Sequence, residues 1–232
     1  MQPPKRTGGG SGGREQQLMP DGTQPATIVG IFSVGTQTTS FRGQEKKSAR
    51  LLISFELTEG RDIEIEKKKE HIKYLISGDY PYSYYKDSSL KRAVESLIGR
   101  KMTEIEKEGD EEGNGFFDLE TLLGSPCMID IQNTEYESKK YNETRTDQKV
   151  KSVLALPKAL TAVMTEPQRE PITFDINEYG SLEKLQECEK FKGLNKFVMG
   201  KVKASLEYKE LQKMAGNANT EEPEEVSSED NN

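Results

Sequence analysis

The sequence predicts a mainly β domain with peripheral helices. Apolar and polar residues alternate between positions 26 and 77 and again between 127 and 156, which is the period of half-buried strands. A helical period lies between these two blocks and returns after residue 181. Hydrophobic residues make up 32% of the chain and charged residues 31%, so we expect part of the chain to lie outside the core.

Three regions follow from the composition. Residues 1–25 are predicted to form a disordered Gly-rich arm, residues 26–215 a single domain with a C-terminal helical extension, and residues 216–232 a disordered acidic tail. The net charge of the chain is −7, but the tail carries much of it. The overall charge therefore does not exclude a polyanionic partner.

The small numbers of histidines and cysteines limit the kinds of catalytic or metal site that the chain can form. His71 is the only histidine, and the two cysteines, Cys127 and Cys188, lie far apart. We expect reduced thiols, no cofactor, and neither a His-based catalytic site nor a multi-His metal site. No apolar run approaches the length of a membrane span or a signal peptide. A cytoplasmic protein without a membrane partner is therefore expected.

The first half of the domain reads as strands. The first is expected from Ala26 to Gly35, with a bulge or bend at Gly30. In the second, residues 51, 53, 55 and 57 share one apolar face, and Arg50 lies on the other face. Residues 61–77 predict a strand or a strand pair.

A helix and two further strands are expected next. Asp87 or Ser88 can cap a helix that Gly99 ends. Residues 104–115 read as an acidic loop, and residues 116–126 as a short helix or turn. The later strands are expected at 127–132 and 148–156, and they are followed by an extended Pro-containing crossing. Two or three short helices are predicted between residues 181 and 214.

The order of these elements favours a particular barrel. Five strands with a helix between the third and the fourth is the order of the OB-fold. That fold binds oligonucleotides on a barrel face and on the loops between strands one and two and between strands four and five. The sequence therefore predicts an OB-fold five-stranded barrel with C-terminal helices.

Basic and aromatic residues occur together at both of those loops. Single-strand binders need cations for phosphates and flat rings on which bases stack. The first predicted hairpin holds Phe41, Arg42, Lys46, Lys47 and Arg50. The second holds Tyr136, Lys139, Lys140, Tyr141 and Arg145. Two ordinary charged turns are the alternative.

A cluster of tyrosines precedes the predicted helix. Its members are Tyr80, Tyr82, Tyr84 and Tyr85, and Lys86, Lys91 and Arg92 follow. The cluster is expected to form a stacking surface at the mouth of a groove, where the rings meet bases and the cations meet phosphates. A packing layer with exposed hydroxyls is the alternative.

Two acidic segments of the chain, residues 104–112 and the C-terminal tail, each allow a functional interpretation. Residues 104–112 are rich in carboxylates that a two-metal nuclease could use, but a solvated loop fits their Gly-rich setting better. The tail is expected to compete with nucleic acid or to recruit basic partners, and a solubilising end is the alternative. Its acids are Glu221, Glu222, Glu224, Glu225, Glu229 and Asp230.

Several short segments resemble a group of phage-encoded single-stranded DNA-binding proteins. They are VGTQ (residues 34–37), LLISFEL (51–57), LLGSPCMIDI (122–131), SVLALPK (152–158) and the late FKGLNKFVMGKVKASLEYKEL. The architecture is similar to that of the T7-type proteins, which have an OB-fold and an acidic C-terminal tail. The likeness spans about residues 26–210. The tail departs from the pattern because it ends in Asn232, where such tails often carry an aromatic residue.

This resemblance implies a role in phage DNA replication, recombination or repair. The implied partners are single-stranded DNA and, through the tail, a polymerase or helicase. We therefore expect a non-enzymatic protein that binds and protects single-stranded DNA with little sequence specificity. Self-association into a homodimer is also considered. The alternative is a phage protein-interaction or assembly module, whose interface would be the tyrosine cluster and the late helices. A nuclease that depends on Glu111 and Glu112 is the third hypothesis.

Overall fold

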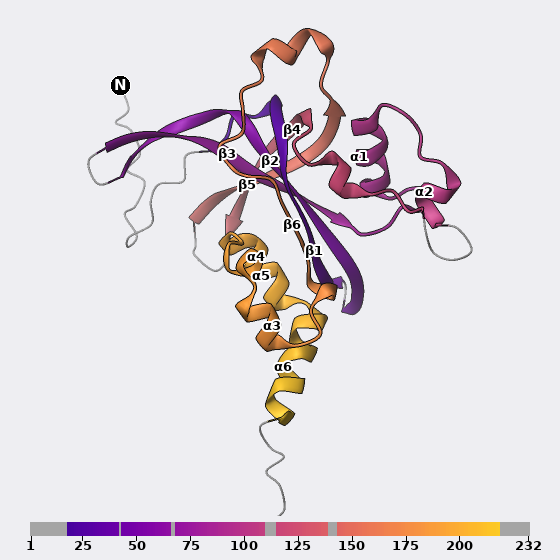
Figure 1. Cartoon of the computed structure of the whole chain (residues 1–232). Helices are drawn as coiled ribbons and strands as arrows, with labels where there is room; N and C mark the ends of the chain where they lie inside the picture. Colours follow the sequence, from indigo (N-terminus) through magenta and orange to yellow (C-terminus); the bar gives the residue numbers. More distant parts are fainter. Residues whose placement is uncertain (1–17, 42, 66–67, 110–114, 139–142, 219–232) are drawn as a thin grey trace, which may run out of the picture.

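The computed structural model describes residues 18–41, 43–65, 68–109, 115–138 and 143–218, which form a mainly antiparallel sheet with helices packed against it (Figure 1). The strands are β1 (Gly22–Phe41), β2 (Gln44–Ile65), β3 (Lys68–Pro81), β4 (Pro126–Ser138), β5 (Glu143–Ala155) and β6 (Ile172–Asp175). The α-helices are α1 (Ser89–Ile98), α2 (Glu104–Glu108), α3 (Leu182–Glu187), α4 (Glu189–Lys192), α5 (Lys196–Ala204) and α6 (Leu206–Ala218). The 3₁₀ turns are η1 (Leu119–Leu122), η2 (Lys158–Val163) and η3 (Ile176–Glu178).

The sheet runs in the order β3-β2-β1-β4-β5, and β6 lies parallel to β1. The register of β1 shifts between Ile28 and Gly30, where a Cβ on Gly30 would meet the Phe32 ring at 2.4 Å. This confirms the predicted bulge. Among the described residues no hydrogen-bonded ladder joins β3 to β5, so the sheet is six-stranded and open rather than the five-stranded closed barrel that was expected.

Two apolar cores lie on opposite faces of β1 and β2. Successive side chains of a strand point to opposite faces, and Leu52 and Ile53 are both fully buried. Ile53 belongs to a core that is covered by α1 and η1. Leu52 belongs to a second core with Phe32, β6 and the helices α3 to α6. The C-terminal extension is thus part of the packed domain.

Several predicted boundaries are confirmed and others are wrong. The helix after β3 begins after Ser88 and ends at the left-handed Gly99, as expected, but the Ser88 hydroxyl donates to the Ser83 carbonyl and does not cap the helix. β1 begins at Gly22, ahead of the predicted Ala26, and residues 61–77 belong to the hairpin of β2 and β3. The expected acidic loop contains α2. The C-terminal region holds four α-helices where two or three were predicted, because breaks at Cys188 and Ser205 divide it further.

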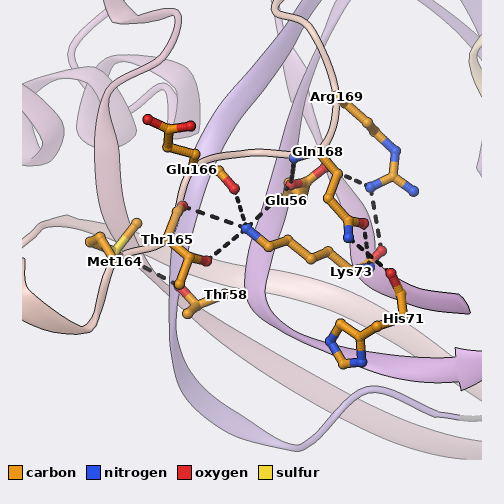
Figure 2. A network of polar contacts seen from close by, with 9 residues as sticks. All are labelled: Glu56, Thr58, His71, Lys73, Met164, Thr165, Glu166, Gln168 and Arg169. Atoms are coloured by element: carbon orange, nitrogen blue, oxygen red, sulfur yellow. Dashed lines mark hydrogen bonds and ion pairs between the residues drawn. The ribbon is translucent and has the colours of Figure 1, made fainter.

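A segment that precedes β6 is tied to the sheet by a buried polar network (Figure 2). Glu56 is 2% exposed. Its carboxylate accepts a hydrogen bond from the backbone N–H of Gln168 at 2.6 Å and pairs with the Arg169 guanidinium at 2.7 Å. Lys73 Nζ lies 3.8 Å from the same carboxylate and donates to Thr165 Oγ1 at 2.7 Å. A buried carboxylate needs such partners, so the network fixes the path of the chain across this face.

Within the described residues, no helix is long and apolar enough to cross a membrane.

Candidate nucleic-acid interface

A hollow of about 1080 Å³ lies between the segment that joins β3 to α1 and the segment around α2. We call it the tyrosine hollow. Its lining combines aromatic rings with charged side chains: Tyr82, Ser83, Tyr84, Tyr85, Lys86, Lys91, Glu104, Lys107, Glu108, Phe116 and Phe117. The structure therefore brings Tyr82, Tyr84 and Tyr85 of the predicted cluster together with two phenylalanines that come much later in the chain, whereas Tyr80 is buried in the core beneath α1.

Backbone hydrogen bonds hold the tyrosines at the end of the sheet. The ladder between β2 and β3 ends where Arg50 faces Pro81, and the Tyr82 amide then donates to the Ala49 carbonyl at 2.9 Å. The Ser88 amide donates to the Tyr85 carbonyl at 2.9 Å, which forms a turn ahead of α1. The rings are thus presented by a folded turn and not by a long loop.

The aromatic side chains differ in their exposure. Tyr85 is 83% exposed, Phe116 51% and Tyr82 44%. These three rings are open to a flat ligand. Tyr84 packs against the core beside α1, and its hydroxyl has no hydrogen-bond partner in the described part of the chain. Burial, with a smaller effect of Tyr82, raises the pKa of Tyr84, so this ring forms part of the wall.

Lysines and glutamates both contribute to the lining of the hollow. Lys86 is exposed, and Lys107 pairs with Glu104. Lys91 Nζ lies 3.9 Å from the buried carboxylate of Glu95. The lining holds three lysines and two glutamates, and the charge of Glu95 beside Lys91 offsets this excess. Lys86 is then the cation of the lining that is most open to an external anion, because ion pairs moderate the attraction of the other two lysines.

Glu95 joins α1 to the segment that leads to α2. Its carboxylate accepts from the Met102 amide at 3.1 Å and from Lys101 Nζ at 3.0 Å. Burial would raise the pKa of Glu95, but these hydrogen bonds outweigh it and hold the pKa below the ordinary glutamate range. The charged carboxylate therefore fixes one wall of the tyrosine hollow against the other.

The first predicted hairpin reaches past the tyrosine hollow. Lys46 and Lys47 are exposed near its tip, on the part of β2 that extends beyond the end of β3. Arg50 is engaged within the protein, because its guanidinium pairs with Asp79 at 2.7 Å. Arg92 is exposed on α1 but does not line the hollow. Phe41 ends β1, and Arg42 lies outside the described residues.

The second predicted hairpin is described only at its base. Tyr136 on β4 faces Arg145 on β5, and both are exposed. The residues Lys139, Lys140 and Tyr141 lie outside the described residues. So do Glu111, Glu112 and the acids of the tail, Glu221, Glu222, Glu224, Glu225, Glu229 and Asp230.

The sequence interpretation missed Phe116, Phe117 and Lys107 as members of the site. A pair of adjacent phenylalanines outside a strand was the available signal, but nothing local connects them to the tyrosines. In the described ranges no three His, Cys, Asp or Glu side chains are grouped as metal ligands would be. Cys127 and Cys188 are free thiols, and burial raises the pKa of Cys127 to about 12.

No family model and no curated protein matches this chain. The assignment of a function therefore rests on the geometry described above.

Proposed function

We propose that this protein binds single-stranded DNA with little sequence specificity and has no catalytic activity of its own. The observation that carries the proposal is the tyrosine hollow, where Tyr82, Tyr85 and Phe116 expose their rings beside lysines. Stacking of a base on an aromatic side chain contributes about 1–3 kcal/mol and tolerates every base. The lysines would meet the phosphates between stacked bases.

The strand arrangement supports an OB-fold as the finer description of the fold. The order β3-β2-β1-β4-β5 has at its two ends the strands that close such a barrel, and these ends approach each other. The helix α1 follows β3, as that fold requires. The lysine-bearing hairpin of β1 and β2 then corresponds to the first binding loop of an OB-fold.

The biological setting proposed is phage DNA replication, recombination or repair, in the cytoplasm of the bacterial host. The resemblance of the short segments to phage single-stranded DNA-binding proteins supports this setting. The acidic tail would recruit a polymerase or helicase, or compete with DNA for the cationic site. These partner roles rest on the charge of residues 219–232 and on the resemblance.

Titration of fluorescently labelled oligo-dT at low salt tests the proposal. We expect binding that is tighter than to duplex DNA and that weakens steeply as salt increases. The double variant Y82A/Y85A removes two exposed rings, and we expect it to lower the affinity by at least about 5-fold, the equivalent of one weak stack.

The matched control is Val163→Ala on η2, which removes an exposed apolar side chain elsewhere. We expect this variant to bind as the wild type does. Wild-type protein that does not bind oligo-dT, or that prefers the duplex, would reject the proposal and favour a protein-interaction module.

A further inference from the structure

We infer that helix α5 carries a second contact site for single-stranded nucleic acid, on the face of the sheet opposite the tyrosine hollow. The site would consist of Phe197, on which a base stacks, with Lys196, Lys201 and Lys203 as phosphate contacts. The inference rests on the proposed function and extends it to the C-terminal extension, a part of the chain outside the strand order of an OB-fold.

Helix α5 has one buried and one exposed side. Val198 and Val202 are fully buried in the second core. Phe197 points away from that core and is 52% exposed, although burial of a phenylalanine normally stabilises a fold. Lys201 Nζ lies 5.8 Å from the centre of the Phe197 ring, within the range of a cation–π contact. An exposed ring beside a cation is the combination that stacks bases and binds phosphates.

The charge of α5 is entirely positive. Its residues Lys196–Ala204 include three lysines and no acid. Lys196 and Lys203 are exposed, and neither forms an ion pair with any residue that the structure describes. Their charges are therefore available to an external anion, whereas two of the three lysines that line the tyrosine hollow, Lys91 and Lys107, have a carboxylate beside them.

A cationic track connects α5 to the first hairpin. Lys201 Nζ lies 3.0 Å from Asp79, which also pairs with Arg50 on β2. Two cations thus offset this one acid. The Gln37 side chain donates to the Lys201 carbonyl at 2.9 Å, which holds α5 beside the base of the hairpin. Because side chains alternate along β2, Lys46 lies on the same face as Arg50 and continues the track toward the hairpin tip.

The same alternation assigns Lys47 to the other face, on the side of the tyrosine hollow. The two sites meet at the end of β3. Tyr82 follows Asp79 by three residues, which is about 10 Å of extended chain. A single strand could therefore pass from the hollow around this edge to α5.

The test measures affinity against the length of oligo-dT, from about 4 to about 16 nucleotides, which is the range of site sizes known for OB-folds. The variants are F197A and the charge reversal K196E/K203E. For the longest oligomers we expect F197A to weaken binding by roughly 5- to 100-fold, which is the value of one stacked base. For the shortest oligomers, which the tyrosine hollow can hold alone, we expect no change.

Two controls separate this inference from the proposed function. Val163→Ala and Lys158→Glu change one exposed apolar and one exposed charged side chain on η2, the orange turn at the top of Figure 1 and away from α5, and both are expected to bind as the wild type does. If the wild type binds and Y82A/Y85A does not, while F197A and K196E/K203E bind long oligomers normally, the second site is rejected and the function stands. An equal loss for short and long oligomers would also reject it, because Phe197 would then act through the fold.

Discussion

At the scale of single residues, the side chain of Gln168 makes the two hydrogen bonds that a neighbouring strand would otherwise make to β3. Its Oε1 accepts from the Lys73 amide and its Nε2 donates to the His71 carbonyl, both at 2.9 Å. The two groups belong to the free edge of β3, where unpaired backbone invites pairing with another chain. The amide side chain of Gln168 thus provides hydrogen-bond partners for one backbone N–H and one backbone C=O at this edge (Figure 2).

Gln168→Ala should therefore destabilise the protein by about 1–2 kcal/mol, because two backbone groups lose their partners. The backbone bond from residue 168 to Glu56 remains, so the segment should stay in place. Urea unfolding measures the change in free energy, and hydrogen exchange should become faster at the Lys73 amide. Gln132→Ala on β4 is the matched control, since Gln132 is exposed and forms no side-chain hydrogen bond with a described residue. Equal effects of the two substitutions would contradict this account.

At the scale of elements, α2 is a short helix that depends on its first turn. The Thr103 hydroxyl accepts from the Glu106 amide at 3.2 Å, and the Glu106 carboxylate accepts from the Thr103 amide at 2.7 Å. The Arg100 guanidinium makes two further bonds to that carboxylate, at 2.7 and 2.8 Å. A helix of five residues has little stability without such a cap.

These hydrogen bonds, from Arg100 first and then from Thr103, lower the pKa of Glu106 to about 2. An unfolded glutamate has a pKa of about 4.3. Because the folded value is the lower one, the stabilisation is complete above about pH 4.3 and is lost as the pH falls toward 2. We expect Glu106→Gln to lower the melting temperature at pH 7 and to have a clearly smaller effect near pH 2.5, measured by circular dichroism.

Arg100→Gln serves as the partner variant in that experiment, because it removes the same pair from the other side. Its effect should shrink with falling pH in the same way. If the two substitutions act independently at pH 7, the pair does not stabilise α2.

Elements with a local signal could be predicted from the sequence. The helix α1 has an apolar stripe, a cap residue and a terminal glycine within about a dozen positions. The capping box of α2 was also present as Thr103 and Glu106, but the acidic Gly-rich composition around it favoured a loop. β6 has only four residues and pairs with β1 across more than a hundred positions, so no local pattern marks it. The site could be predicted only in part for the same reason. Its tyrosines lie close together in the sequence, whereas Phe116 is far from them in the sequence and lies beside them only in the folded chain.

At the scale of the whole molecule, the C-terminal extension covers the face of β2 that an alternating strand would otherwise leave to solvent. The sequence predicted alternation with one apolar face, at residues 51, 53, 55 and 57, and that face is buried. The opposite face carries Leu52 and the charged Glu56, and both are buried as well. Helices α3 to α6 and β6 bring Phe174, Leu185 and Val198 against Leu52, and the segment that precedes β6 covers Glu56 through Gln168 and Arg169. The two cores share strands β1 and β2, so we expect them to unfold together.

Two adjacent substitutions test this shared packing. Leu52→Ala and Ile53→Ala each remove a fully buried side chain, from the second and the first core respectively, and each should cost about 2–5 kcal/mol in urea unfolding. Leu154→Ala on β5 is the control, because its side chain is 49% exposed and its loss should cost no more than about 0.5 kcal/mol. In each variant the transitions followed by tyrosine fluorescence and by circular dichroism should coincide. If Leu52→Ala costs no more than the control, the extension does not pack on this face, and α5 could not then hold Phe197 beside the track of cations.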